Sequence, residues 1–157
     1  MQTSRHNKVL QEIINAINEP WIVYKEPRIA WQDSYLKPDL VVVNQATKQA
    51  YCLDVTIAYE NDKDSLVLAD QRKRSKYGPI RDEVIKFLES KGIQPTKVEV
   101  VGLAFGSRGA LHSTTLNVLT TIFEMPKSKM ANLSDIVRQQ SIYIYNAFRR
   151  GLRTDII

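Results

Sequence analysis

The chain has 157 residues, of which 43% are hydrophobic and 25% are charged, the usual composition of a folded globular domain. Its 22 Lys and Arg residues against 17 Asp and Glu residues give a formal charge of +5, which suits a polyanionic partner. The single cysteine, Cys52, excludes an intrachain disulfide, and no apolar run approaches the roughly 18 residues of a membrane span. The polar N-terminus does not resemble a secretory signal. We therefore expect one domain over residues 1–157 and no membrane partner.

The first predicted element is an amphipathic helix followed by a strand. Apolar residues recur from Leu10 at i, i+3, i+4 and i+7, with polar residues on the opposite side. Ser4 is a suitable N-cap, and Pro20 ends the helix because the residue before a proline avoids the α region. Residues 21–25 (WIVYK) then have the aromatic and β-branched content of a strand.

Two apolar runs, residues 40–43 and 50–58, flank the short polar segment 44–49 and predict a β-hairpin. If the loop is symmetric, the numbers of paired residues sum to 93. Asp39 then lies opposite Asp54, with both side chains on one face and Cβ atoms about 5 Å apart. The pattern therefore predicts two neighbouring carboxylates at the open end of the hairpin.

The rest of the chain predicts helices with one further strand. The expected elements are a helix over 65–77, a helix over 80–91 that ends at Gly92, a strand over 97–105, and helices over 113–124 and 133–151. The order α-β-β-β-α-α-β-α-α indicates a layered α/β domain with a small mixed sheet flanked by helices.

Asp39 and Asp54 are candidates for a metal-dependent phosphodiesterase site. Hard carboxylate oxygens bind Mg²⁺, which needs only one or two of them, and a lysine can position the attacking water. Two other interpretations stay open. Asp39 follows a proline and could be an ordinary turn residue. Asp54 interrupts an apolar strand, where a salt bridge to a lysine would also compensate its charge.

Three motifs carry a resemblance to a known family. They are Lys-Pro-Asp-Leu at 37–40, Asp-Val-Thr at 54–56 and Lys-Arg-Ser-Lys-Tyr at 73–77. Together they resemble the restriction-like endonuclease domain of site-specific non-LTR retrotransposons. Arg-His-Asn at 5–7 and Val-Val-Gly-Leu at 100–103 are also similar to that family, as is the amphipathic C-terminal helix.

The resemblance implies the PD-(D/E)xK nuclease fold, with Mg²⁺ or Mn²⁺ held by Asp39 and Asp54. The commonest pattern of that superfamily has a lysine two residues after the second acid, where this chain has Thr56. In the retrotransposon branch the lysine lies on the following helix, so Lys73 or Lys76 would take the catalytic role. The two lysines are three residues apart and share a helix face, so the choice between them stays open.

The resemblance and the charge pattern also suggest further site residues. Glu12 and Glu26 are the candidates for a third acid, and neither is preferred over an exposed glutamate. A basic cluster over 72–76 and an arginine in a glycine-flanked loop would contact phosphates without reading base sequence. The predicted DNA-binding residues are Arg5, His6, Arg72, Arg74, Tyr77 and Arg108.

The function implied is a nuclear endonuclease that nicks a target DNA duplex. The nick would leave a 3′-OH that primes reverse transcription, and target choice would belong to other domains of a larger retrotransposon protein. A rival hypothesis is a structure-selective nuclease of the Holliday-junction-resolvase type, which would predict a homodimer. Another is an inactive nuclease fold that serves as a nucleic-acid-binding scaffold.

Overall fold

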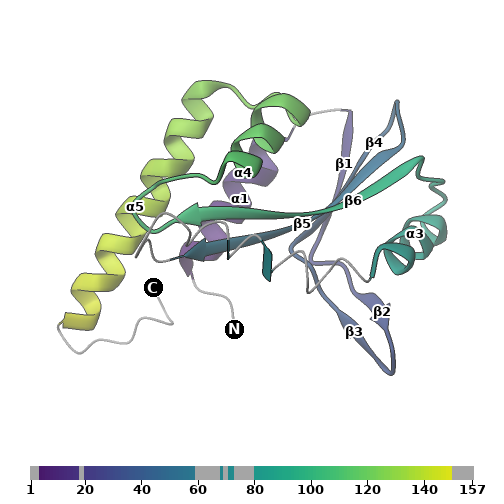
Figure 1. Cartoon of the computed structure of the whole chain (residues 1–157), viewed down its shortest axis with the longest axis horizontal. Coiled ribbons are helices and arrows are strands. Elements are labelled where there is room, and N and C mark those ends of the chain that lie inside the picture. The colour runs from purple at the N-terminus through teal and green to yellow at the C-terminus, as the bar shows by residue number, and fades with distance from the viewer. Residues whose placement is uncertain (1–3, 18–19, 59–67, 69–70, 73–79, 150–157) are drawn as a thin grey trace. The chain divides into compact units, whose positions relative to one another are not determined.

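A computed structural model describes residues 4–17, 20–58, 68, 71–72 and 80–149, and side chains up to residue 142. Its elements are α1 (Ser4–Ala16), β1 (Trp21–Lys25), β2 (Ile29–Trp31), β3 (Ser34–Leu36), β4 (Leu40–Asn44), β5 (Gln49–Ala58), α3 (Arg81–Ser90), β6 (Lys97–Gly106), α4 (Ser113–Asn117), the π-helical turn η2 (Val118–Ile122) and α5 (Lys127–Arg149) (Figure 1). Within these residues, no helix is both long enough and apolar enough to cross a bilayer.

The described residues form two compact units, and the boundary between them falls inside β5 and β6. Unit 1 contains residues 4–17, 55–58 and 104–149. Unit 2 contains residues 20–54 and 80–103, and Arg72 belongs to it. Both units combine segments that are distant in the sequence, so neither is a simple half of the chain.

A four-stranded sheet has the order β1-β4-β5-β6. β1 pairs antiparallel with β4, and β4 pairs antiparallel with β5. The arrows of β5 and β6 point the same way in Figure 1, so the sheet is mixed. The predicted α/β class with a small mixed sheet is therefore confirmed.

The hairpin of β4 and β5 has the predicted register. Leu40 pairs with Leu53 and Val43 pairs with Ala50, so the numbers of paired residues sum to 93. The polar loop is closed by the side chain of Asn44, whose Oδ1 accepts hydrogen bonds from the backbone N–H of Ala46 at 2.9 Å and of the next residue at 3.1 Å. A side-chain oxygen that binds backbone N–H groups two and three residues later stabilises a tight turn.

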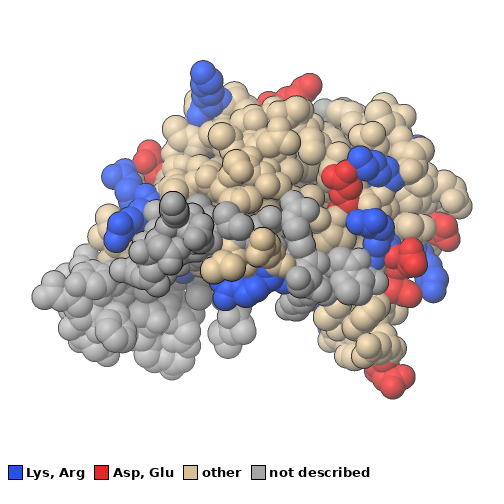
Figure 2. Space-filling model, viewed as in Figure 1, with Lys and Arg blue, Asp and Glu red and all other residues tan. Residues whose placement is uncertain are grey.

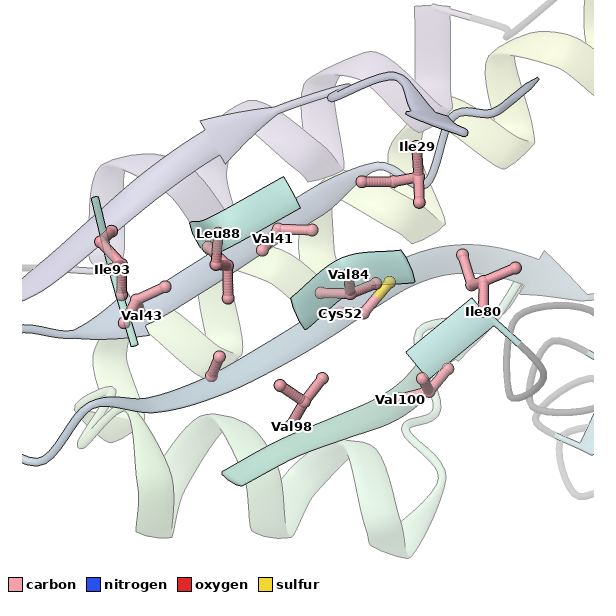
Figure 3. Packing of buried hydrophobic residues seen from close by; sticks show 11 residues of the cluster. Ile29, Val41, Val43, Cys52, Ile80, Val84, Leu88, Ile93, Val98 and Val100 are labelled. Atoms are coloured by element: carbon pink, nitrogen blue, oxygen red, sulfur yellow. The ribbon is translucent and has the colours of Figure 1, made fainter. Parts of the chain in front are cut away.

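The core of unit 2 forms where α3 packs on one face of the sheet. Ile80, just before the helix, and Val84 and Leu88 within it recur every four residues and are fully buried. They belong to one cluster with the hairpin residues Val41 and Cys52, and Figure 3 shows Leu88 near Val41 and Val84 near Cys52. Burying each such aliphatic side chain stabilises the fold by about 1.5–3 kcal/mol. The helix ends before Gly92, whose φ of 79° is left-handed and favours glycine.

In unit 1, α1 and α5 pack against each other. Arg5 Nη1 donates a hydrogen bond to Ser141 Oγ at 3.0 Å, and Asn132 Nδ2 donates one to Glu12 Oε2 at 3.3 Å. Both bonds join residues more than one hundred positions apart, so the first and last described helices are held together by polar contacts as well as by apolar packing.

Two helices differ from the prediction over 113–124 and 133–151. The first is α-helical only to Asn117 and continues as η2, where Thr120 Oγ1 donates back to the carbonyl of Leu116 at 2.7 Å. The second begins six residues early, at Lys127. The carbonyl of Pro126 accepts its first hydrogen bond, and proline is well tolerated at a helix start.

The antiparallel β2–β3 hairpin was not predicted. Of the predicted helix over 65–77, the structure describes Leu68, Gln71 and Arg72, which are helical. The remainder of that segment lies outside the described residues.

Candidate metal-binding site

Asp39 immediately precedes β4 and is held through its backbone by two neighbouring segments. Its carbonyl accepts a hydrogen bond from the N–H of Glu26, just after β1, at 2.8 Å. Its own N–H donates to Asp54 Oδ1 of β5 at 3.1 Å. Pro38, which is buried, restricts the preceding residue to extended conformations. Asp39 is only 1% exposed, and hydrogen bonds to the segments on both sides of it define its position.

Asp54 lies in the middle of β5 and is 4% exposed, between the buried residues Leu53 and Val55. The hydrogen bond from the Asp39 N–H fixes the orientation of its carboxylate. The register extended by one pair places Asp54 opposite Asp39, which agrees with that bond. The predicted juxtaposition of the two acids is therefore present at the backbone level, and the bonding carboxylate oxygen reaches across the hairpin.

Cys52 lies close enough to both acids for their charges to act on its thiol. Burial, and then the negative charges of Asp54 and Asp39, together raise the pKa of its thiol to about 12. Side chains two residues apart in a strand share a face, so Cys52 and Asp54 point to the same side of the sheet. That side carries the α3 core, which places the two carboxylates at the edge of an apolar layer.

The two carboxylates match the ligands that a protein commonly supplies to a divalent cation. Two carboxylates offer hard oxygen ligands, and Mg²⁺ is commonly held by one or two carboxylates together with waters and substrate phosphates. Across the described parts of the chain, no group of three or more His, Cys, Asp and Glu side chains could hold a metal ion. The site could thus hold a cation that substrate and water help to coordinate, and not one enclosed by protein ligands.

The two candidates for a third acid lie in different places. Glu26 is in unit 2, where the β1–β4 register carried one step further places it opposite Asp39. Its φ of 48° ends the strand at that residue. Its carboxylate does not form a group of three possible metal ligands with those of Asp39 and Asp54. Glu12 is in unit 1 and accepts the hydrogen bond from Asn132 of α5. Glu12 therefore bonds to α5 within unit 1, and Glu26 contributes its backbone to the position of Asp39; a third-acid role for either stays a prediction.

Most of the predicted basic residues cannot be placed. Arg72 is exposed and helical in unit 2. Lys73, Arg74, Lys76 and Tyr77 lie outside the described residues. The choice between the two lysines for the catalytic role therefore stays open, and the contribution of the cluster to DNA binding stays a prediction.

The other predicted DNA contacts belong to unit 1. Arg5 is half-buried, and burial lowers the pKa of its guanidinium below the ordinary value. Its Nη1 donates to Ser141, so part of its hydrogen-bonding capacity serves to hold α5. His6 is half-buried next to it on α1, and Arg108 is exposed in the turn that follows β6. Their contacts with DNA stay predictions.

Charges of both signs alternate over α3. On the face that Figure 2 shows, blue and red side chains are interspersed in the region of this helix. Lys86 Nζ and Glu83 Oε1 form an exposed ion pair at 3.3 Å, a contact that adds little stability. This helix surface is therefore not a single-sign patch.

The chain was also compared with known proteins. No protein-family model matches it, and no curated protein matches it.

Proposed function

We propose that this chain is a metal-dependent DNA endonuclease domain of the restriction-like class. The observation that carries the proposal is the Asp39–Asp54 pair, two buried acids on neighbouring strands with the backbone of one bound to the carboxylate of the other. The resemblance of the motifs at 37–40, 54–56 and 73–77 to the retrotransposon endonucleases supports the biological role that we propose for the domain. In that role, a segment of a larger non-LTR retrotransposon protein nicks a DNA duplex in the nucleus.

Burial makes the pair costly unless a cation accompanies it. Two like charges in a low-dielectric environment repel each other, and each buried carboxylate loses several kcal/mol of hydration. A cation bound by both acids would compensate these costs, and Mg²⁺ or Mn²⁺ is the ion that their oxygens suit. The exposure of 1% for Asp39 and 4% for Asp54 is the quantity on which this argument depends.

The reaction would be the attack of a water oxygen on the scissile phosphorus. A new P–O bond forms, the P–O3′ bond breaks, and the leaving oxygen takes a proton to become the 3′-OH. When bound, Mg²⁺ or Mn²⁺ supplies charge stabilisation at the phosphate and lowers the pKa of a bound water. Asp39 and Asp54 would hold the ion, and the Asp39 N–H keeps the Asp54 carboxylate oriented before substrate arrives. Lys73 or Lys76 would position the water or offset the developing negative charge.

A plasmid-nicking assay tests the proposal. Supercoiled plasmid is incubated with the chain in Mg²⁺, in Mn²⁺ and in EDTA, and conversion to the open circle is followed on a gel. We expect open circles with either metal and none in EDTA. Asp54→Ala should abolish nicking, because it removes a metal ligand and the acceptor of the Asp39 N–H.

Matched variants separate the site from general loss of folding. Glu83→Gln removes one acid from α3, in the same unit, and should nick like the parent. A parent that cuts branched DNA in preference to duplex, and elutes as a dimer, would instead support a resolvase-type enzyme. A parent that binds DNA but never cuts it with any metal would support the scaffold hypothesis and contradict the proposal.

A further inference from the structure

The β2–β3 hairpin is a two-stranded ribbon with one buried face and one exposed face. Its register pairs Ile29 with Leu36 and Ala30 with Tyr35. Paired residues of an antiparallel ribbon share a face. Ile29 is fully buried in the core beneath α3, and Leu36 packs partly against it. This face anchors the ribbon to unit 2, while Figure 1 shows the ribbon extending away from the sheet.

The other face of the ribbon carries two cations and an aromatic ring. Arg28, Ala30, Tyr35 and Lys37 all belong to it and are all exposed. The guanidinium carbon of Arg28 lies 4.6 Å from the centroid of the Tyr35 ring, and Tyr35 is 47% exposed. The arginine thus lies over the ring, and Tyr35 remains exposed to a ligand.

The charges on this face favour an anionic ligand. The register carried one step further places Arg28 opposite Lys37, and like charges directly opposite each other destabilise a strand pair. A phosphate between them would remove that repulsion. A phosphate next to an open aromatic ring is the combination that a nucleic-acid strand presents, since its bases stack on aromatic side chains while its backbone binds cations.

The ribbon lies close to the acid pair along the chain, so a ligand bound to the ribbon would also lie near the acid pair. Lys37 is two residues before Asp39, so their Cα atoms are at most about 7 Å apart. A strand whose phosphate is bound by Lys37 would therefore pass next to the candidate metal site. Ribbon and acid pair belong to the same unit, so their proximity follows from unit 2 alone.

We propose that the exposed face of the β2–β3 ribbon binds a single-stranded segment of DNA beside the cleavage site, with Arg28 and Lys37 on its phosphates and a base stacked on Tyr35. The inference rests on the proposed function in taking DNA as the ligand. It goes further, because an unpaired base is required for stacking and a closed duplex does not offer one. The ribbon would therefore favour frayed or opened DNA over intact duplex.

The test measures binding without cleavage. Fluorescence anisotropy follows a labelled oligothymidylate of about 20 nucleotides, in EDTA, over a series of salt concentrations. Tyr35→Ser should weaken binding at least about fivefold, whereas Tyr35→Phe keeps the ring and should bind like the parent. Arg28→Gln with Lys37→Gln should reduce the slope of log affinity against log salt by about 1.4, the value for two lost phosphate contacts on a single strand.

The matched control is Lys86→Gln with Lys91→Gln, which removes two exposed cations from the α3 region of the same unit. It should leave unchanged both the affinity for oligothymidylate and the loss of affinity that Tyr35→Ser causes. Equal affinity of the parent and Tyr35→Ser would overturn the inference, as would an equal loss in the α3 control. Absence of oligothymidylate binding by the parent would also overturn it. Nicking is measured separately, so a chain that binds the single strand but never cuts contradicts the nuclease proposal alone.

Discussion

Replacing Asp54 by asparagine tests whether the buried pair is a cation site. The amide oxygen of Asp54→Asn can still accept the hydrogen bond that Asp39 N–H donates at 3.1 Å, so the local geometry is retained. The substitution removes one of two negative charges that are buried at 1% and 4% exposure. Repulsion between the carboxylates then disappears. In EDTA, the variant should therefore melt at the same temperature as the parent or higher.

The metal-dependent part of the stability gives the magnitude. At a metal concentration of 100 times the dissociation constant, binding to the folded state adds about 2.7 kcal/mol to the free energy of unfolding. For a chain of 157 residues, each kcal/mol corresponds to about 2–4 °C in melting temperature. The parent should thus gain about 5–11 °C in saturating Mg²⁺ or Mn²⁺, and Asp54→Asn should lose most of that gain.

Differential scanning fluorimetry with and without metal provides the measurement, and nicking is assayed on the same preparations. A different result is expected if Asp54 is the partner of a buried lysine. Removing the charge would then leave an ammonium unpaired and cost about 3–5 kcal/mol, or roughly 6–20 °C, in EDTA. Such a loss, together with a parent whose melting temperature does not respond to metal, would refute the reasoning.

Three further predictions concern the basic cluster, the buried thiol and the core. Replacing Arg72, Arg74 and Lys76 by glutamine should weaken binding to duplex DNA of any sequence and lower the salt slope by about 2.7, measured by anisotropy. Burial, and then the charges of the two acids, raise the pKa of Cys52 from 9.0 to about 12. The stability that the neutral thiol contributes is therefore complete below pH 9 and is lost as the pH rises toward 12. Urea melts should show this loss in the parent and not in Cys52→Ala. Leu88→Ala should lower the free energy of unfolding by about 2–5 kcal/mol in urea melts, because Leu88 lies on the buried face of α3 and is fully buried.

Each of these predictions has a control in the chain. For the charge variant it is Lys86→Gln, which removes an exposed cation from α3 and should leave the slope unchanged. For the core variant it is Leu116→Ala, since Leu116 is 46% exposed and its truncation should cost little. An equal loss of stability in both leucine variants would contradict the packing argument. A parallel pH dependence in the parent and the Cys52→Ala variant would contradict the assignment of the alkaline loss to the thiol.

Local sequence patterns were sufficient for several elements. The predicted first helix is present as α1 from Ser4 to Ala16, and the strand predicted over 21–25 has those bounds. The register of the β4–β5 hairpin also follows the predicted sum of 93. These features depend on periodicity, capping and a short symmetric loop, which are interactions between residues close in sequence.

Elements whose stability depends on distant contacts were not predictable in this way. The β2–β3 ribbon has strands of three residues, too short for an alternation to be visible. Its turn contains Gln32 at φ 52°, without the glycine that signals a hairpin. Ile29 holds the ribbon in place through the core beneath α3, about fifty residues later in the chain. The exposed face with Arg28 and Tyr35 therefore appears only in the tertiary structure.

The acid pair shows the same division. The sequence by itself determined that Asp39 and Asp54 oppose each other, because strand alternation and loop symmetry decide the register. Only the tertiary structure decided how deeply the two acids are buried, since that depends on what covers the sheet. It also placed Glu26 beside Asp39, because β1 pairs with β4 and the Glu26 N–H donates to the Asp39 carbonyl. Register is a local property of two adjacent strands, whereas burial and the choice of neighbour arise from packing between segments far apart in the chain.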